Sequence, residues 1–130
     1  MAARWSIPLD KLAEQQKERL HLVVRKITFE AFRRVVQRSP VDTGRFRANW
    51  NVSYGAPDYT TTLSTEQGRG TAEAGKALTL PVGGVVYLSN GLPYAERLEY
   101  GWSKQAPAGM VRVTVAEFDA IVSGSARAEQ

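Results

Sequence analysis

The 130-residue chain is 43% hydrophobic and carries a formal net charge of +4, which gives enough apolar content for the core of one domain spanning residues 1–130. It contains no cysteine, which excludes disulfides, thiolate metal sites and cysteine nucleophiles. No apolar run approaches the roughly 20 residues of a membrane span, and the N-terminal residues lack the apolar segment of a signal peptide. We therefore expect a protein made and used in the cytoplasm, with no membrane partner.

The charge is unevenly distributed along the chain. Residues 1–50 hold eleven Lys and Arg against five Asp and Glu, whereas residues 51–130 hold six against eight. A basic half suits contact with an acidic protein surface or with nucleic acid. A solvated amphipathic helix explains the same charges equally well.

Residues 8–38 have the pattern of one long helix. Ser6 is placed to cap its start, Pro8 fits the first turn, and Asp10 complements the helix dipole there. Pro40 ends it, because the residue before a proline is pushed out of the α region. Apolar side chains recur at spacings of 4, 3, 4 and 4 and form one stripe: Leu20, Val24, Ile27, Ala31 and Val35.

This helix would be roughly 45 Å long, whereas a domain of this size is only about 36 Å across. The helix is therefore expected either to bend or to overhang the domain. Phe29 and Phe32 lie off the apolar stripe, so an overhanging helix would offer them to a partner. The alternative is a kinked helix that folds wholly on its own sheet.

Short elements are predicted after the long helix. Asp42 and Thr43 are candidate caps of a short helix over residues 44–49, and residues 50–54 alternate apolar and polar as in a half-buried strand. Residues 56–80 are rich in Thr, Ser, Gly and Ala and predict a long flexible loop, with at most a helical turn at 71–77. Residues 82–89 predict the second strand.

The C-terminal third is less clearly patterned. Residues 93–100 predict a two-turn helix that begins at Pro93 and ends before Gly101. Residues 110–122 fit a strand or a helix, and we favour a helix that begins near residue 110. The small, polar residues 123–130 predict a frayed tail.

Motifs for chemistry are weak. Residues 70–76 match the GxxxxGK part of a phosphate-binding loop, but Ala77 stands where a Mg²⁺-binding hydroxyl is needed. His21 is the only histidine and lies within the long helix, with no serine marked as a nucleophile. We therefore expect no enzyme activity and no catalytic, cofactor-binding or metal site, and a small hydrolase is the lowest-ranked hypothesis.

Two charged groups of residues favour ion pairing over chemistry. Glu96 and Glu99 lie near Arg97 and Lys104, so an ion-paired surface is favoured over an acid/base pair. A nucleic-acid-binding module is conceivable from five arginines near Phe46 and Trp50: Arg33, Arg34, Arg38, Arg45 and Arg47. Because Glu30 can pair with Arg33 or Arg34, a salt-bridged or protein-facing cluster is favoured.

Two segments carry a resemblance to a known family. Residues 39–50 read SPVDTGRFRANW and residues 90–101 read NGLPYAERLEYG. They resemble, in the same order, the PVDTGRLR-x-SW and N-x-x-PYA-x-x-x-EYG segments of small neck proteins of long-tailed bacteriophages, known as tail-completion, head–tail joining or minor tail proteins. Lys104 and residues 106–110 match what usually follows. With the long helix, the resemblance covers most of the chain, and residues 56–80 are the least matched part.

The resemblance implies an α+β fold in which a long N-terminal helix packs on a small antiparallel sheet with short additional helices. It implies a structural virion protein at the head–tail junction, without catalysis or a cofactor, that assembles as a ring. Six copies would suit the symmetry of a tail. The implied partners are the connector or stopper, the tail terminator and the tail tube, with non-specific contact to DNA in the channel. A tail terminator ring that controls tail length is the alternative.

Residue roles follow from these segments. Asp42, Thr43 and Gly44 are expected to set the first turn, and Gly101 to end the 93–100 helix. The interface candidates are the aromatic and charged side chains of the two segments, with the two phenylalanines off the helix stripe: Phe29, Phe32, Arg45, Arg47, Tyr94, Glu99, Tyr100, Trp102 and Lys104. A buried structural role for Trp50 and Tyr94 is an equal alternative.

Overall fold

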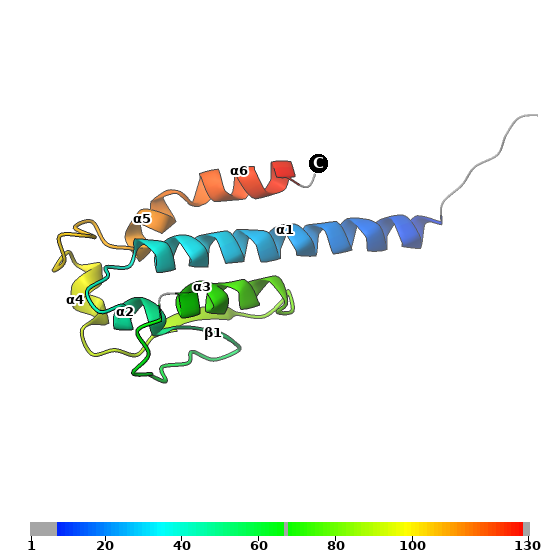
Figure 1. Cartoon of the computed structure of the whole chain (residues 1–130). Coiled ribbons are helices and arrows are strands. Elements are labelled where there is room, and N and C mark those ends of the chain that lie inside the picture. Colours follow the sequence, from blue (N-terminus) through cyan, green and yellow to red (C-terminus); the bar gives the residue numbers. More distant parts are fainter. Residues whose placement is uncertain (1–7, 67, 129–130) are drawn as a thin grey trace, which may run out of the picture.

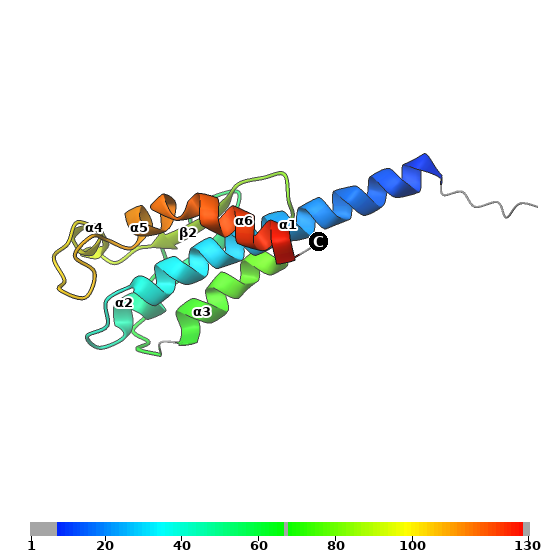
Figure 2. The same cartoon turned by 90° about the horizontal axis from the view of Figure 1, so that it is seen from above.

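The computed structural model describes residues 8–66 and 68–128, and its fold is α+β, as expected (Figure 1). A long helix, α1, runs through the middle, with a two-stranded sheet and the short helix α3 on one side and the C-terminal helices on the other (Figures 1 and 2). In chain order the elements are α1 (Leu9–Arg38), α2 (Arg45–Ala48), β1 (Trp50–Tyr54), α3 (Gly68–Gly75), the 3₁₀ turn η1 (Lys76–Leu78), β2 (Val86–Asn90), α4 (Ala95–Glu99), α5 (Val111–Ala116) and α6 (Phe118–Ala128).

Helix α1 begins and ends where local signals predict. The carbonyl of Pro8 accepts hydrogen bonds from the N–H groups of Lys11 and Leu12, and Asp10 lies in the first turn. Ser39, which precedes Pro40, is extended with ψ at 134° and stops the helix. Ser6, the expected cap, lies outside the described residues.

The first turns of α1 extend beyond the rest of the fold (Figures 1 and 2). Residues 9–20 are all exposed, and we call them the α1 overhang; Leu9 is 80% and Leu20 61% exposed. The overhang is thus confirmed, and the alternative of a helix folded wholly on its own sheet is wrong. Val36 lies off the predicted stripe and is fully buried. Helix α1 packs against elements on two sides, so its buried surface is wider than one stripe.

The sheet consists of β1 and β2, paired antiparallel with Val52 opposite Leu88. Strand β2 begins at Val86, later than predicted, because Gly83 adopts a φ of +111° in a preceding turn. Burial along β1 also departs from simple alternation. Asn51, expected on a polar face, is 3% exposed because its side-chain amide donates to the carbonyl of Thr60 at 2.7 Å.

Residues 56–80 are more ordered than the predicted flexible loop. The helical turn at 71–77 is confirmed but belongs to a longer segment, α3 and η1, which packs on α1. Gly70 is required there, since a Cβ would lie 2.8 Å from the side chain of Val36 and would also meet a backbone carbonyl. The preceding residues 56–66 are held by buried side chains, with the N–H of Thr62 donating to Asn49 at 2.8 Å. The expectation that residues 56–80 form a flexible loop is therefore wrong.

The C-terminal part is helical. Gly101 has a φ of +89° directly after α4 and its cap residue Tyr100, which confirms its predicted role. The helix expected from residue 110 is confirmed, but it breaks at Glu117 into α5 and α6. The frayed tail is wrong for residues 123–128, because α6 continues through them and packs along α1, which buries Ile121. Residues 129–130 lie outside the described residues.

The core lies at the C-terminal end of α1. Val36 is fully buried there, and the rings of Phe46 and Trp50 meet edge to face with centroids 5.7 Å apart. Of the two roles expected for Trp50, buried structural residue or interface contact, the structure shows the buried one. None of the helices in the described part of the chain is both long and apolar enough to cross a bilayer.

Candidate assembly interface

The turn between α1 and α2 is set by two of its three predicted residues. Gly44 precedes α2 with a φ of +94°, a conformation that favours glycine. The hydroxyl of Thr43 accepts a hydrogen bond from the N–H of Arg45 at 3.2 Å. Asp42 is exposed and makes no cap bond to α2, so its predicted capping role is wrong.

The two arginines of this turn bind inward. Arg45 donates to the carbonyl of Thr62 at 3.3 Å, and Arg47 donates to the carbonyls of Gln37 and Ser39 at 2.9 and 2.7 Å. Burial lowers the pKa of the Arg47 guanidinium. These side chains hold the turn against the end of α1 and against residues 56–66, rather than forming the exposed contact surface expected of them.

The remaining arginines of the predicted cluster belong to an ion-pair network. Glu30 pairs with Arg33 at 2.6 Å and with Arg34 at 2.8 Å, and hydrogen bonds from these guanidinium groups lower its pKa. Arg38 pairs with Glu117 at 2.5 Å. Its hydrogen bond to that carboxylate lowers the pKa of Glu117, and a hydrogen bond from Arg34 lowers it to a smaller extent. The salt-bridged cluster is confirmed for Arg33, Arg34 and Arg38. The pairing of Arg38 with Glu117 could not be predicted from the sequence, because the two residues lie about 80 positions apart in the chain.

The segment around α4 presents an exposed aromatic edge. Trp102 is 72% exposed with the guanidinium of Arg97 lying 4.8 Å from its ring centroid, and Tyr100 is 63% exposed beneath Arg112 at 4.9 Å. We call these four side chains the aromatic edge. Lys104 is exposed close to it in the sequence.

Tyr94 lies between core and surface. It is 38% exposed and its ring contacts the buried Phe46, with centroids 6.1 Å apart. Its contact with Phe46 gives the side chain a structural role, whereas its role as an interface contact stays a prediction.

Glu99 is turned into the fold, contrary to its expected place at a contact surface. Its carboxylate accepts hydrogen bonds of 2.9 Å from the N–H groups of Met110, Val111 and Arg112, at the start of α5. Burial alone would raise the pKa of Glu99, but these backbone donors outweigh it and the pKa is lowered. Its ion pair is with Arg112 at 3.3 Å, not with the expected Arg97 or Lys104.

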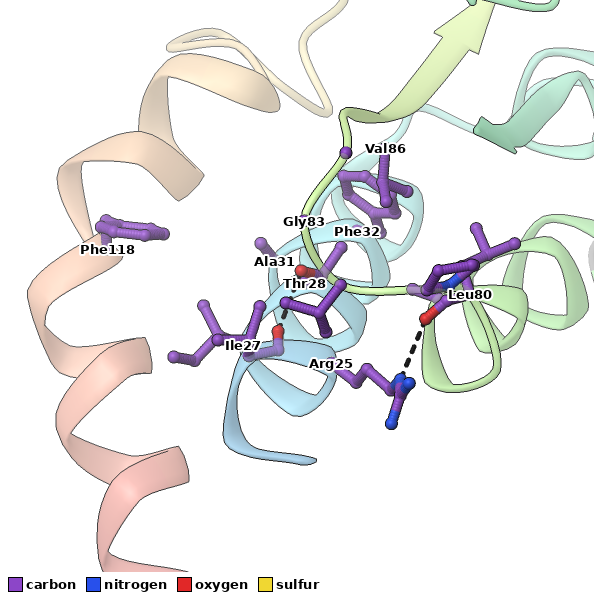
Figure 3. Close-up of a pocket in the computed structure, with 14 residues that line it drawn as sticks. Arg25, Ile27, Thr28, Ala31, Phe32, Leu80, Gly83, Val86 and Phe118 are labelled. Atoms are coloured by element: carbon purple, nitrogen blue, oxygen red, sulfur yellow. Dashed lines mark hydrogen bonds between the residues drawn. The ribbon is translucent and has the colours of Figure 1, made fainter. Parts of the chain in front are cut away.

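An apolar groove runs beside α1, between β2 and the C-terminal helices (Figure 3). A cavity of about 440 Å³ and a neighbouring one of about 280 Å³ share lining residues on α1 and Phe118 on α6. Figure 3 shows Phe118 across the gap from Phe32 and Val86. We call this the α1–β2 groove and define it by its main lining residues: Ile27, Phe32, Val86, Leu88, Val115 and Phe118.

Phe29 lies on the other flank of α6, in a second apolar hollow of about 400 Å³ shared with Leu78 and Ile121. Phe29 and Phe32 are both only partly covered by the chain. Neither lies on the α1 overhang, where the sequence analysis expected them to be offered, and their role as contacts stays a prediction.

The structure groups no chemical site around the rejected motifs. Residues 70–76 lie in α3 and η1 instead of in a phosphate-binding loop. Across residues 8–66 and 68–128, no three His, Cys, Asp or Glu side chains are placed to hold a metal ion. The incompletely covered surfaces of the described residues include the α1 overhang, the α1–β2 groove and the aromatic edge.

Comparisons of the chain with protein-family models, with curated proteins and with solved structures find no match. The function is therefore inferred from the two sequence segments and from these surfaces.

Proposed function

We propose that the chain is a structural protein of the neck of a long-tailed bacteriophage. It forms a ring that completes the tail end and joins the tail to the DNA-filled head. The observation that carries this proposal is that the α1 overhang and the α1–β2 groove are both left uncovered by the single chain. The resemblance of residues 39–50 and 90–101 to phage neck proteins suggests which assembly would cover these two surfaces.

The overhang comprises residues 9–20, whereas the groove is lined by α1 residues from Val24 onward, so one does not cover the other within a chain. Contacts between unlike surfaces of successive copies are heterologous, and they close into a ring when the rotation between copies allows it. Six copies would match the symmetry of a tail. The protein would then act by geometry, with one face of the ring toward the head and the other toward the tail.

The aromatic edge supplies a second contact surface. Tyr100 and Trp102 are exposed, large and held by stacked arginines, which lowers the conformational freedom lost on binding. Tyrosine, tryptophan and arginine are the residue types that dominate binding energy at protein interfaces. We assign this edge to neighbouring neck or tail proteins, namely the connector or stopper, the terminator and the tail tube.

Deleting the gene from the phage genome and imaging the lysate by negative-stain electron microscopy tests the proposal. We expect DNA-filled heads beside unattached tails of normal length. Abnormally long tails would instead favour the tail terminator alternative, in which the ring controls tail length. Intact virions in normal numbers would overturn the neck assignment.

A further inference from the structure

Strand β2 has an open edge. The N–H of Val52 on β1 points away from β2 and donates to Glu73 at 3.1 Å. In an antiparallel ladder the residue opposite, Leu88, then also turns its N–H and C=O away from its partner strand. The bond from the N–H of Gly55 to the carbonyl of Val85 fits the same alternation, which turns the backbone of Val86 outward as well.

The two edges of the sheet differ. The β1 edge is covered by α3, whose Glu73 receives the outward N–H of Val52 and whose Arg69 reaches the carbonyl of Ala48 and the side chain of Asn51. Within the described chain, the outward N–H groups of Val86 and Leu88 donate no hydrogen bond and their outward carbonyls accept none. An uncovered edge is where a further strand pairs.

The space beside the open edge is apolar. The α1–β2 groove has α1 as its floor, with Phe32 beneath, and α5 and α6 as its far wall, where Val115 and Phe118 are 66% and 48% exposed. A strand laid against β2 would extend the sheet over this floor. Its side chains would point alternately into the groove and to the opposite face. A short segment with apolar side chains at every second position would therefore fit the groove.

Such a segment directly precedes the α1 overhang in the sequence. Residues 3–7 read ARWSI, in which Ala3, Trp5 and Ile7 alternate with Arg4 and Ser6. This period of two is typical of a half-buried strand, with an aromatic and a β-branched residue on its apolar side. These residues lie outside the described part of the structure.

The segment cannot reach the open edge of its own chain. Leu88 lies near Phe32, which is 23 residues along α1 from Leu9 and therefore about 34 Å away. Even Val24, the groove residue nearest the overhang, is about 22 Å from Leu9. The four residues from Leu9 back to Trp5 span at most about 14 Å. Only a neighbouring copy can bring its own residues 3–7 to this edge.

We propose that residues 3–7 of one copy pair with β2 of the next copy as a third strand and place Trp5 and Ile7 in its α1–β2 groove. This inference rests on the proposed ring assembly and specifies its interface. The α1 overhang acts as the spacer that carries the strand to the neighbour. Arg4 and Ser6 then lie on the opposite face of the sheet, the face of Tyr87 and Ser53.

Disulfide trapping tests the pairing directly, because the natural chain has no cysteine to interfere. Tyr87 on β2 and Ser53 on β1 are register partners on one face of the sheet. We expect Ser6→Cys or Arg4→Cys to cross-link separate copies when combined with Tyr87→Cys. The same arm variants combined with Ser53→Cys are the control and should not cross-link, since Ser53 lies one strand farther away. Non-reducing gels and native mass spectrometry give the readout.

The groove contact is tested by Trp5→Ser/Ile7→Ser, with Arg4→Ala/Ser6→Ala as the matched control in the same segment. We expect the first pair to dissociate the ring and the second to leave it assembled, with unchanged helicity by circular dichroism in both. A ring that survives Trp5→Ser/Ile7→Ser and gives no Tyr87→Cys cross-link would overturn the strand exchange but leave ring assembly standing. Disulfides confined to single chains would show that residues 3–7 reach β2 of their own chain and would overturn the exchange between copies. A wild-type chain that stays monomeric at every concentration tested would overturn both.

Discussion

The indole N–H of Trp50 donates a 2.8 Å hydrogen bond to the hydroxyl of Ser39, and both side chains are buried. The same hydroxyl donates to the carbonyl of Val35 at 2.9 Å. One small side chain at the end of α1 therefore satisfies the last turn of the helix and the first residue of β1. The segment 39–50, which carries half of the family resemblance, is closed on itself by this bond.

Ser39→Ala should lower the free energy of unfolding by about 1–3 kcal/mol, because it leaves the buried indole N–H without an acceptor. Urea denaturation followed by tryptophan fluorescence measures the change. Ser53→Ala is the control, since that hydroxyl bonds to the carbonyl of Ala56 in an exposed turn, and it should shift stability by less than about 0.5 kcal/mol. Equal losses in the two variants would contradict the assigned role of Ser39.

Glu99→Gln should destabilise the fold by about 1–3 kcal/mol at neutral pH, because three backbone donors lose a charged acceptor. The folded-state pKa of Glu99 is lowered from its ordinary value of 4.5. Its contribution is therefore fully present above pH 4.5 and is lost as the pH falls through the lower folded pKa. Denaturation curves at a series of pH values should show wild type and variant converging in acid. The exposed Glu96→Gln is the control, and a difference independent of pH would count against the charge.

Gly101→Ala should cost about 1–3 kcal/mol, since the residue has a φ of +89° and the new Cβ would lie 2.7 Å from the carbonyl oxygen of Pro107. Gly124→Ala in α6 is the matched substitution, because it meets nothing within 4 Å. It should stabilise the fold by about 0.5–1 kcal/mol. Thermal denaturation of the two variants should therefore move in opposite directions, and a shift of the same sign would refute the comparison.

Trp102→Ala should leave stability within about 0.5 kcal/mol of wild type, because the side chain is exposed, yet impair virion assembly. Complementation of the deletion phage by the variant, scored by plaque counts and electron microscopy, measures the second effect. Tyr59→Ala removes an aromatic ring of similar exposure that is not part of the aromatic edge, and it should complement fully. Normal virions with Trp102→Ala would exclude this edge from the interface.

Wild-type protein should bind duplex DNA weakly, since the central arginines are paired with Glu30 and Glu117. Glu30→Gln/Glu117→Gln frees those guanidinium groups and should raise the affinity and make it fall more steeply with salt. Fluorescence anisotropy with labelled duplex over a salt series distinguishes the two proteins. Tight, steeply salt-dependent binding by the wild type would instead favour the nucleic-acid-binding alternative.

The features predicted from the sequence are those with local causes. Pro40 ends α1 by sterics within one residue, and Gly101 follows α4 because a positive φ is needed there. The length of α1 against the size of the domain was enough to predict that the helix either bends or overhangs, and the structure shows the overhang. The pairing of Glu30 with Arg33 and Arg34 was also predictable, since these residues lie within one helical turn.

The features that the sequence did not reveal depend on partners distant in the chain. Glu99 looked like a surface carboxylate until α5 placed three N–H groups against it, and Glu117 joins Arg38 from the other end of the molecule. Asn51 is buried because residues 58–60 fold over it, which alternation along one strand cannot show. The placement of Phe118 opposite Phe32 likewise required the path of α6.

The central position of α1 has a consequence for synthesis of the chain. Helix α6, which covers one side of α1, begins 80 residues after α1 ends. At about 5–20 residues per second, the ribosome needs about 4–16 s to bridge that interval. During this time the apolar surface of α1 around Phe29 and Phe32 is exposed, because α6 has not yet been made. Other nascent chains in the same cell expose the same surface. Early pairing between nascent chains along this surface of α1 is therefore a misassembly that the order of synthesis favours.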